Sequence, residues 1–264
     1  MELKKQSEYG KLSDLTFLEL FKRCSSGDTN NTEADLKLFC YLVSKMQTKL
    51  RLMNNAENDE VYLDDYGYLV DDEESRYLLY IKINKLIKNS TKSKLTPEEL
   101  QSLLYRLLSV GVIVDNGNNR ATILPAFIKF EISLAEEDKD VAILFNGPAI
   151  EMLIELKESW IYVYSQELKE LTGKFMIGLY YQYRKFRRTG VIKMSIDEAK
   201  LFFMCSTYSN IEFNRRLKGY IEKFNSKLGT DLKLETLKKE GKTSGIKITF
   251  TPEKAKQKIG YATP

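Results

Sequence analysis

The stretch that decides the fold begins at Val191 and reads VIKMSIDEAKLFFMCSTYSNIEFNRRLKGYIEKFN up to residue 225, and residues 234–250 then read LETLKKEGKTSGIKITF. Two Ser-x-x-Glu pairs in it have the spacing of a capping box, which begins a helix: Ser195 with Glu198, and Ser209 with Glu212. Three runs typical of strands surround these helices, at residues 191–194, 232–237 and 246–250. The expected order is strand, helix, helix and hairpin.

One more helix precedes this stretch. Ser165 is a suitable N-cap, and apolar residues continue at helical spacing as far as Phe186. Thr189 and Gly190 are expected to end this helix near Arg187. With it, the order becomes helix, strand, helix, helix and hairpin, which is that of a winged helix-turn-helix.

The first half of the chain repeats this pattern in a coarser form. Three helices are expected, at Glu33 to about Met53, at Ser75–Lys88, and from the N-cap Thr96 to a stop at Gly111. A hairpin of residues 112–114 and 122–124 should follow. Further strands are expected at 127–134 and 141–145, and a connecting helix at 149–157. The sequence therefore predicts an α+β protein of two tandem winged-helix domains, residues 1–158 and 159–264.

Charge is sorted between these two domains. The 264 residues carry 41 Lys and Arg against 37 Asp and Glu, a formal net charge of +4. Residues 1–159 contain 20 basic and 27 acidic residues, whereas residues 160–264 contain 21 and 10. Such asymmetry indicates a polyanionic partner for the second domain only.

Several chemistries are excluded by composition. The chain has no histidine, so a hydrolase triad with an imidazole base and a histidine-ligated zinc site are both ruled out. It also lacks a phosphate-binding Gly-rich loop and a Rossmann fingerprint. Tyrosine-only strand transfer would normally need a basic, histidine-rich pocket. We therefore expect a binding protein, with no enzymatic activity and no cofactor.

The cellular setting follows from cysteines and hydropathy. Three widely spaced cysteines match neither a disulfide framework nor a metal motif, and they suit a reducing cytoplasm. No apolar run approaches the length of about 18 residues that a membrane span needs. The N-terminus lacks the apolar core of a signal peptide. The expectation is a cytoplasmic protein with no membrane partner.

Residues 57–74 form a strongly acidic segment, with nine carboxylates and no basic residue. A divalent-metal site is one interpretation, using Asp64, Asp65, Asp71 and Asp72. The spacing does not match an EF-hand loop, which requires Gly and a terminal Glu at fixed offsets. A long exposed loop or hairpin without metal is the preferred interpretation.

The expected helix 209–226 is the candidate recognition helix. At 100° per residue, Arg215 and Gly219 lie opposite its apolar stripe, and Gly219 would allow a close approach to a DNA strand. Arginine in this position can bond a guanine through O6 and N7 together. The candidate DNA contacts of this helix are Ser209, Asn210, Asn214, Arg215, Arg216, Lys218, Gly219 and Lys223.

Other basic residues extend the candidate interface. The expected wing suits contacts to phosphates. The candidates there are Lys238, Lys239 and Lys242, and those around the first helix of the domain are Lys174, Arg187 and Arg188. Secondary contacts from the first domain are expected at Lys94, Gln101, Tyr105 and Arg106. The competing interpretation is that these are ordinary solvated charges, and that the tyrosines around residues 180–183 belong to the core.

From Trp160 onward the chain resembles the iteron-binding replication initiators of theta-replicating bacterial plasmids, a family built from two winged helices. The resemblance rests on residues in matching places of the family pattern: Leu171, Gly173 to Phe175, Leu179, Tyr180, Thr189, Gly190, Glu198, Tyr208 and Arg215 to Lys218. Gly173 is a departure, because the family usually has Ser there. The first half is similar mainly in its order of elements and in the strand pair of Phe127–Phe145 that a helix follows.

The resemblance implies a protein that binds direct repeats of double-stranded DNA at a plasmid origin. It also implies local opening of the origin and recruitment of the host replication initiator and helicase. A homodimer, joined through the N-terminal domain, would repress its own gene, in equilibrium with a monomer that initiates. Two alternatives remain: a transcriptional regulator that binds an inverted repeat, and a protein-interaction scaffold.

Overall fold

The computed structural model describes residues 9–25, 32–55, 76–89, 96–116, 120–132, 140–156 and 160–253. Contacts divide the chain into two compact units, residues 1–169 and 170–264. Both units mix helices with antiparallel strands, so the α+β class is confirmed. The acidic segment 57–74 and Lys94 lie outside the described residues.

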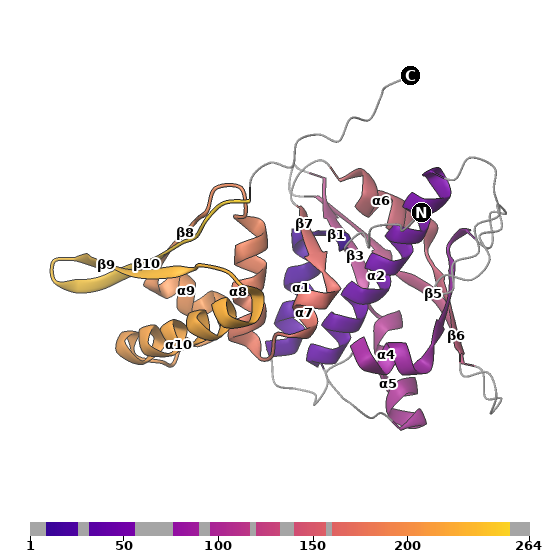
Figure 1. The fold of residues 1–264 in the computed structure, drawn as a ribbon, viewed down its shortest axis with the longest axis horizontal. Coiled ribbons are helices and arrows are strands. Elements are labelled where there is room, and N and C mark those ends of the chain that lie inside the picture. Colours follow the sequence, from indigo (N-terminus) through magenta and orange to yellow (C-terminus); the bar gives the residue numbers. More distant parts are fainter. Residues whose placement is uncertain are drawn as a thin grey trace, which may run out of the picture. The chain divides into compact units, whose positions relative to one another are not determined.

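The second unit is a winged helix (Figure 1). Its elements in chain order are α8 (Lys174–Lys185), β8 (Val191–Ser195), α9 (Ile196–Phe202), α10 (Asn210–Leu228), β9 (Lys233–Lys239) and β10 (Lys242–Thr249). The three strands form an antiparallel sheet in the order β8-β10-β9. The helices meet around Phe175, whose ring stacks on Phe203 at 5.2 Å and on Tyr220 at 4.7 Å between centroids.

The helix starts of this unit follow from local hydrogen bonds. The Ser195 hydroxyl accepts from the Glu198 backbone N–H, and the Glu198 carboxylate accepts in return from the Ser195 N–H, which completes the capping box. The Ser209 hydroxyl accepts from the Glu212 N–H at 3.1 Å, but the Glu212 carboxylate makes other bonds. Only half of the second expected capping box therefore forms.

The wing is longer than the sequence suggested. Glu240 and Gly241 both have positive φ, of 52° and 75°, as in the two-residue turn that suits twisted hairpins. The first strand therefore continues to Lys239 and the second begins at Lys242, whereas the sequence predicted strands that end at residue 237 and begin again at residue 246. Figure 1 shows this hairpin projecting beyond the helices of its unit.

The first unit is built around α2 (Thr32–Asn55), which is buried along most of its length. The elements before and after it are β1 (Tyr9–Ser13), α1 (Asp14–Ser25), β2 (Leu78–Lys82), α4 (Ile83–Asn89), α5 (Pro97–Leu108), β3 (Gly111–Asp115), β4 (Ala121–Pro125), β5 (Phe127–Ile132), β6 (Asp140–Phe145), α6 (Gly147–Glu155), β7 (Trp160–Tyr164) and α7 (Ser165–Lys169). Three of its strands form a sheet in the order β2-β6-β5. This order matches β8-β10-β9, so the first unit also contains a winged helix.

The prediction of a helix at Ser75–Lys88 is wrong in its first part, because Leu78–Lys82 form strand β2. Leu79 and Ile81 are buried there while Tyr80 is 52% exposed, which is the two-residue alternation of a strand. β2 pairs antiparallel with β6. Helix α4 begins only at Ile83.

The wing of the first unit is formed by other strands than the sequence predicted. The expected hairpin of residues 112–114 and 122–124 exists as β3 and β4, but these strands form a separate two-stranded sheet. Strands β5 and β6 form one sheet with β2 and therefore occupy the place of the wing strands. The hairpin β3–β4 is an addition between α5 and the wing.

The long helix expected from Ser165 to Arg187 is two helices, α7 and α8. The helix cannot continue through Gly173, because its φ of 81° is not found in a right-handed helix. The unit boundary also falls at Lys169/Glu170, whereas the sequence suggested 158/159. The reason is that β7 pairs with β1 near the chain's start, which places residues 160–169 in the first unit.

Candidate nucleic-acid interface

Helix α10 presents one apolar face to its unit and one polar face to solvent. The buried face consists of Phe213, Leu217, Ile221 and Phe224. At 100° per residue, one stripe of the solvent-facing side carries Ile211, Arg215, Lys218 and Glu222, all of them exposed, with Arg215 nearest to the point opposite the buried face and Lys218 on the flank. We call these four residues the outer face of α10. It includes both a guanidinium and an exposed aliphatic side chain.

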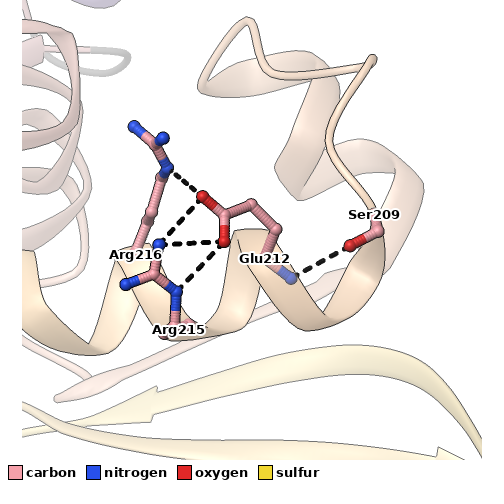
Figure 2. Close-up of polar contacts among 4 residues, drawn as sticks. All are labelled: Ser209, Glu212, Arg215 and Arg216. Atoms are coloured by element: carbon pink, nitrogen blue, oxygen red, sulfur yellow. Dashed lines mark hydrogen bonds and ion pairs between the residues drawn. The ribbon is translucent and has the colours of Figure 1, made fainter.

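Glu212 binds both arginines of the helix (Figure 2). Arg215 donates to its carboxylate through Nε at 3.0 Å and through Nη2 at 2.9 Å, and Arg216 donates through Nε at 2.5 Å. Hydrogen bonds from Arg216 and Arg215 lower the pKa of Glu212, so the carboxylate is ionised at neutral pH. One negative charge is therefore shared by two guanidinium groups.

The two arginines differ in their further surroundings. The Arg216 guanidinium lies 4.8 Å from the centroid of the Tyr208 ring, a cation–π arrangement that holds it against the unit. The Arg215 side chain is 70% exposed and extends from the outer face. Arg215 is accordingly the more exposed of the two arginines, and it must release its hydrogen bonds to Glu212 to contact a base.

The wing carries three exposed lysines at its tip, Lys238, Lys239 and Lys242. Within residues 160–253, none of them forms an ion pair with a carboxylate. Flexible ammonium groups at the end of a hairpin are suited to phosphate contacts, which carry no sequence information. The wing and the outer face of α10 belong to the same unit.

Three of the expected DNA contacts form hydrogen bonds within the protein. The Lys174 ammonium donates to the Met204 carbonyl at 2.8 Å. Arg187 is only 7% exposed and donates to the Arg184 carbonyl at 2.9 Å. Arg106 forms two hydrogen bonds of 2.8 Å with the Asp35 carboxylate on α2. These bonds hold Lys174, Arg187 and Arg106 in place within the fold, and their role as DNA contacts stays a prediction.

The remaining candidates on α10 and nearby have varied settings. Ser209 caps α10, Asn210 accepts a 3.5 Å hydrogen bond from Lys200, and Asn214 is half-buried. A Cβ atom at Gly219 would have no neighbouring atom within 4 Å, so the helix surface is open there. The exposed basic residues are Arg188, Lys218 and Lys223. Ser209 is itself exposed, whereas the side-chain oxygen of Asn214 is buried without a hydrogen-bond partner among the described residues.

In the first unit, α5 stands where α10 stands in the second. Its Gln101 is exposed and Tyr105 is 75% exposed, so both can reach a partner. The basic residue of the set, Arg106, is occupied by Asp35. Helix α5 therefore offers a nearly neutral surface, and the described part of the interface is concentrated in the second unit.

Ile211, on the outer face of α10, was not among the contacts expected from the sequence. Its exposed fraction of 83% is the highest among the large hydrophobic residues that the structure describes as exposed. The helical projection that singled out Arg215 also contains Ile211, four residues earlier on the same side. Its apolar side chain on an otherwise polar helix face is the sequence signal that could have identified Ile211 as a candidate contact.

Comparisons with known proteins give structural likenesses only. No family model and no curated protein matches the chain. A crystal structure of RctB domains 2 and 3 is 10% identical, with a TM-score of 0.45 and coverage of 82% of this chain and 81% of that one. A selenomethionine structure of the same domains is 9% identical, with a TM-score of 0.49 and coverage of 95% and 93%. Both TM-scores are below 0.5, so the function must be inferred from the residues of this chain.

Over the described ranges, no helix is long and apolar enough to cross a membrane.

Proposed function

We propose that the chain is a sequence-specific DNA-binding protein that initiates replication at a plasmid origin. It binds direct repeats, promotes local opening, and recruits the host initiator and helicase by binding alone, without an enzymatic step. The observation that supports DNA binding most directly is the exposed outer face of α10 together with a wing of exposed lysines in one winged-helix unit. The plasmid role rests on the resemblance of residues 165–250 to the iteron-binding initiators.

In this proposal the two elements of the second unit have different tasks. The N-terminal part of α10 enters the major groove, where Arg215 and its neighbours contact base edges. Lys238, Lys239 and Lys242 on the wing contact phosphates and fix the position of the unit on the duplex. Specificity thus comes from the helix, and much of the affinity comes from the wing.

The first unit has the supporting role. It forms the dimer that represses the protein's own gene, and Gln101 and Tyr105 on α5 make secondary DNA contacts. The monomer is the form that initiates replication. A dimer would bind the operator of the gene, and monomers would bind the successive repeats of the origin.

Selection of binding sites from random duplex DNA tests this proposal. Recovery of one common sequence that is bound in tandem as direct repeats, about two helical turns of 10–10.5 base pairs apart, supports an initiator. Recovery of a lone palindrome overturns that role and supports a transcriptional regulator. The selected site should also be probed for strand opening with a reagent specific for single-stranded bases.

The dependence of affinity on salt separates DNA binding from a scaffold function. For a DNA-binding protein, log K falls linearly with log salt, with a slope of about −0.9 for each phosphate contact. A slope near zero on duplex DNA, together with tight binding to an acidic protein, would support the scaffold instead.

A further inference from the structure

The exposed apolar side chain on α10, that of Ile211, buries little of its surface within the protein. Ile211 is the second residue of the helix, directly after the N-cap Ser209 and Asn210. It is 83% exposed, whereas Phe213, two residues later, is fully buried. Because isoleucine is β-branched, it gives no gain in helix propensity over a polar residue such as Glu or Lys. Neither packing nor local helix formation therefore accounts for an isoleucine here.

The neighbours of Ile211 are the polar groups of the candidate interface. Arg215 follows it by four residues and Lys218 by seven, on the same side of the helix. The first turn of a recognition helix is the part whose side chains contact base edges in the major groove. The major groove offers one apolar group, the C5-methyl of thymine, and aliphatic side chains contact it.

We infer that Ile211 recognises the 5-methyl group of a thymine in the DNA site, an inference that rests on the proposed function. The geometry also limits where this thymine lies. Four residues of helix span about 6 Å, and successive base pairs are about 3.4 Å apart. The thymine therefore lies within about two base pairs of the base that Arg215 contacts.

Replacement of thymine by deoxyuridine tests the inference, because it removes only the 5-methyl group. Each thymine of the selected site is replaced in turn, and affinity is measured for the full chain and for Ile211→Ala. One replacement should weaken binding by the wild-type chain about fourfold, the equivalent of about 0.8 kcal/mol for one buried methyl group. The same replacement should have no effect on Ile211→Ala, since the two changes remove one shared contact.

Two further variants make the comparison secure. Ile211→Val keeps a branched aliphatic group and should retain part of the sensitivity to the thymine methyl. Ile128→Ala is the matched control, because Ile128 is also an exposed isoleucine, at 59%, but lies on β5 in the first unit. It should retain the full sensitivity of the wild-type chain.

The outcomes distinguish this inference from the proposed function. If no thymine methyl matters, or if its removal weakens Ile211→Ala as much as wild type, the inference is overturned and specific DNA binding stands. If selection yields no common DNA sequence at all, the proposed function itself fails, and the assignment of Ile211 fails with it.

Discussion

Glu212 is the residue that controls how the arginines of α10 are presented. Its carboxylate accepts hydrogen bonds from both Arg215 and Arg216, and it also brings a negative charge close to the place proposed for DNA. Specific binding must replace part of this arrangement with bonds to a base, whereas unrelated DNA offers only phosphates. We therefore expect the carboxylate to lower non-specific binding more than specific binding, since only the correct site compensates for the lost bonds.

Glu212→Gln should accordingly raise affinity for unrelated duplex DNA and reduce the ratio of specific to non-specific affinity. The uncharged amide no longer holds the guanidinium groups by charge, and it no longer repels phosphates. Titration of the selected site and of unrelated DNA at fixed salt measures the ratio. Glu222→Gln is the control, because Glu222 also lies on the outer face but forms no ion pair with a described residue. An equal effect of both variants would mean that charge alone, and not the bonding of the arginines, is responsible.

Gly190 fixes the junction between α8 and β8. Its φ is 68°, and a Cβ at this position would lie 2.5 Å from the backbone oxygen of Phe250. Gly190→Ala should lower the free energy of unfolding by more than the roughly 1–2 kcal/mol that a left-handed conformation alone costs. Gly229→Ala should show only that smaller cost, because Gly229 has φ 63° and ψ 32°, a left-handed conformation, and no atom within 4 Å of its Cβ position. Chemical denaturation of the two variants gives the comparison, and equal losses would contradict the close contact.

Gly219 lowers the stability of helix α10, but it is proposed to favour DNA binding. Gly219 lies in the middle of the helix, where glycine costs about 0.5–1 kcal/mol relative to alanine. Its Cβ position is open, so no contact among the described residues requires glycine. We propose that a close approach of DNA to the helix is the reason for a residue without a side chain here.

Gly219→Ala should therefore stabilise the protein by about 0.5–1 kcal/mol while weakening specific DNA binding by about 1–3 kcal/mol, the usual cost of overpacking. Thermal unfolding and DNA titration of the same preparation measure both changes. Ser226→Ala is a suitable control, because Ser226 is exposed in the last turn of α10 and the change also favours helix. A gain in stability without loss of binding would show that DNA does not approach Gly219.

Elements with strong local signals were predicted well from the sequence. The N-caps at Thr96, Ser195 and Ser209 all begin helices, because a side-chain oxygen bonds a backbone N–H only a few residues away. Strand β2 was missed because its identity depends on pairing with β6, far along the chain. For the same reason, sequence patterns did not distinguish the additional hairpin β3–β4 from the wing strands β5 and β6.

The candidate site was predictable to a similar extent. Arg215 and the wing lysines follow from helical projection and from their place in a hairpin, so the sequence located them. The engagement of Arg106 by Asp35 joins residues 71 positions apart, and no local pattern reveals it. The shared bonding of Glu212 was hidden differently, because the residue fitted a capping box whose second bond does not form.

Across the whole molecule, the distribution of charged residues between the two units matters more for attraction to DNA than the net charge. The net charge of +4 would give little attraction to DNA if it were spread evenly. The excess of basic residues instead falls after residue 160, in the unit that carries both α10 and the wing. We therefore expect long-range attraction to be directed to the unit that is proposed to recognise bases, and the acidic first unit to limit non-specific binding elsewhere.

Two lysine variants can show whether DNA affinity depends on the net charge of the chain or on the position of each charge. Lys239→Ala and Lys82→Ala both lower the formal net charge from +4 to +3, and both lysines are exposed. If position matters, Lys239→Ala should reduce the magnitude of the salt slope by about one and weaken all DNA sequences alike. Lys82→Ala, on β2 of the first unit, should leave the slope unchanged.

Arg215→Ala completes the comparison, since it also removes one positive charge but from the recognition helix. Its cost should be about 1–3 kcal/mol at the selected site, with relaxed discrimination at one base position. Titrations of specific and unrelated duplexes over a range of salt provide all the required values. A change in base preference caused by Lys239→Ala would contradict the separate tasks of helix and wing. Equal slopes for Lys239→Ala and Lys82→Ala would mean that attraction depends on total charge, and that the wing does not contact phosphates.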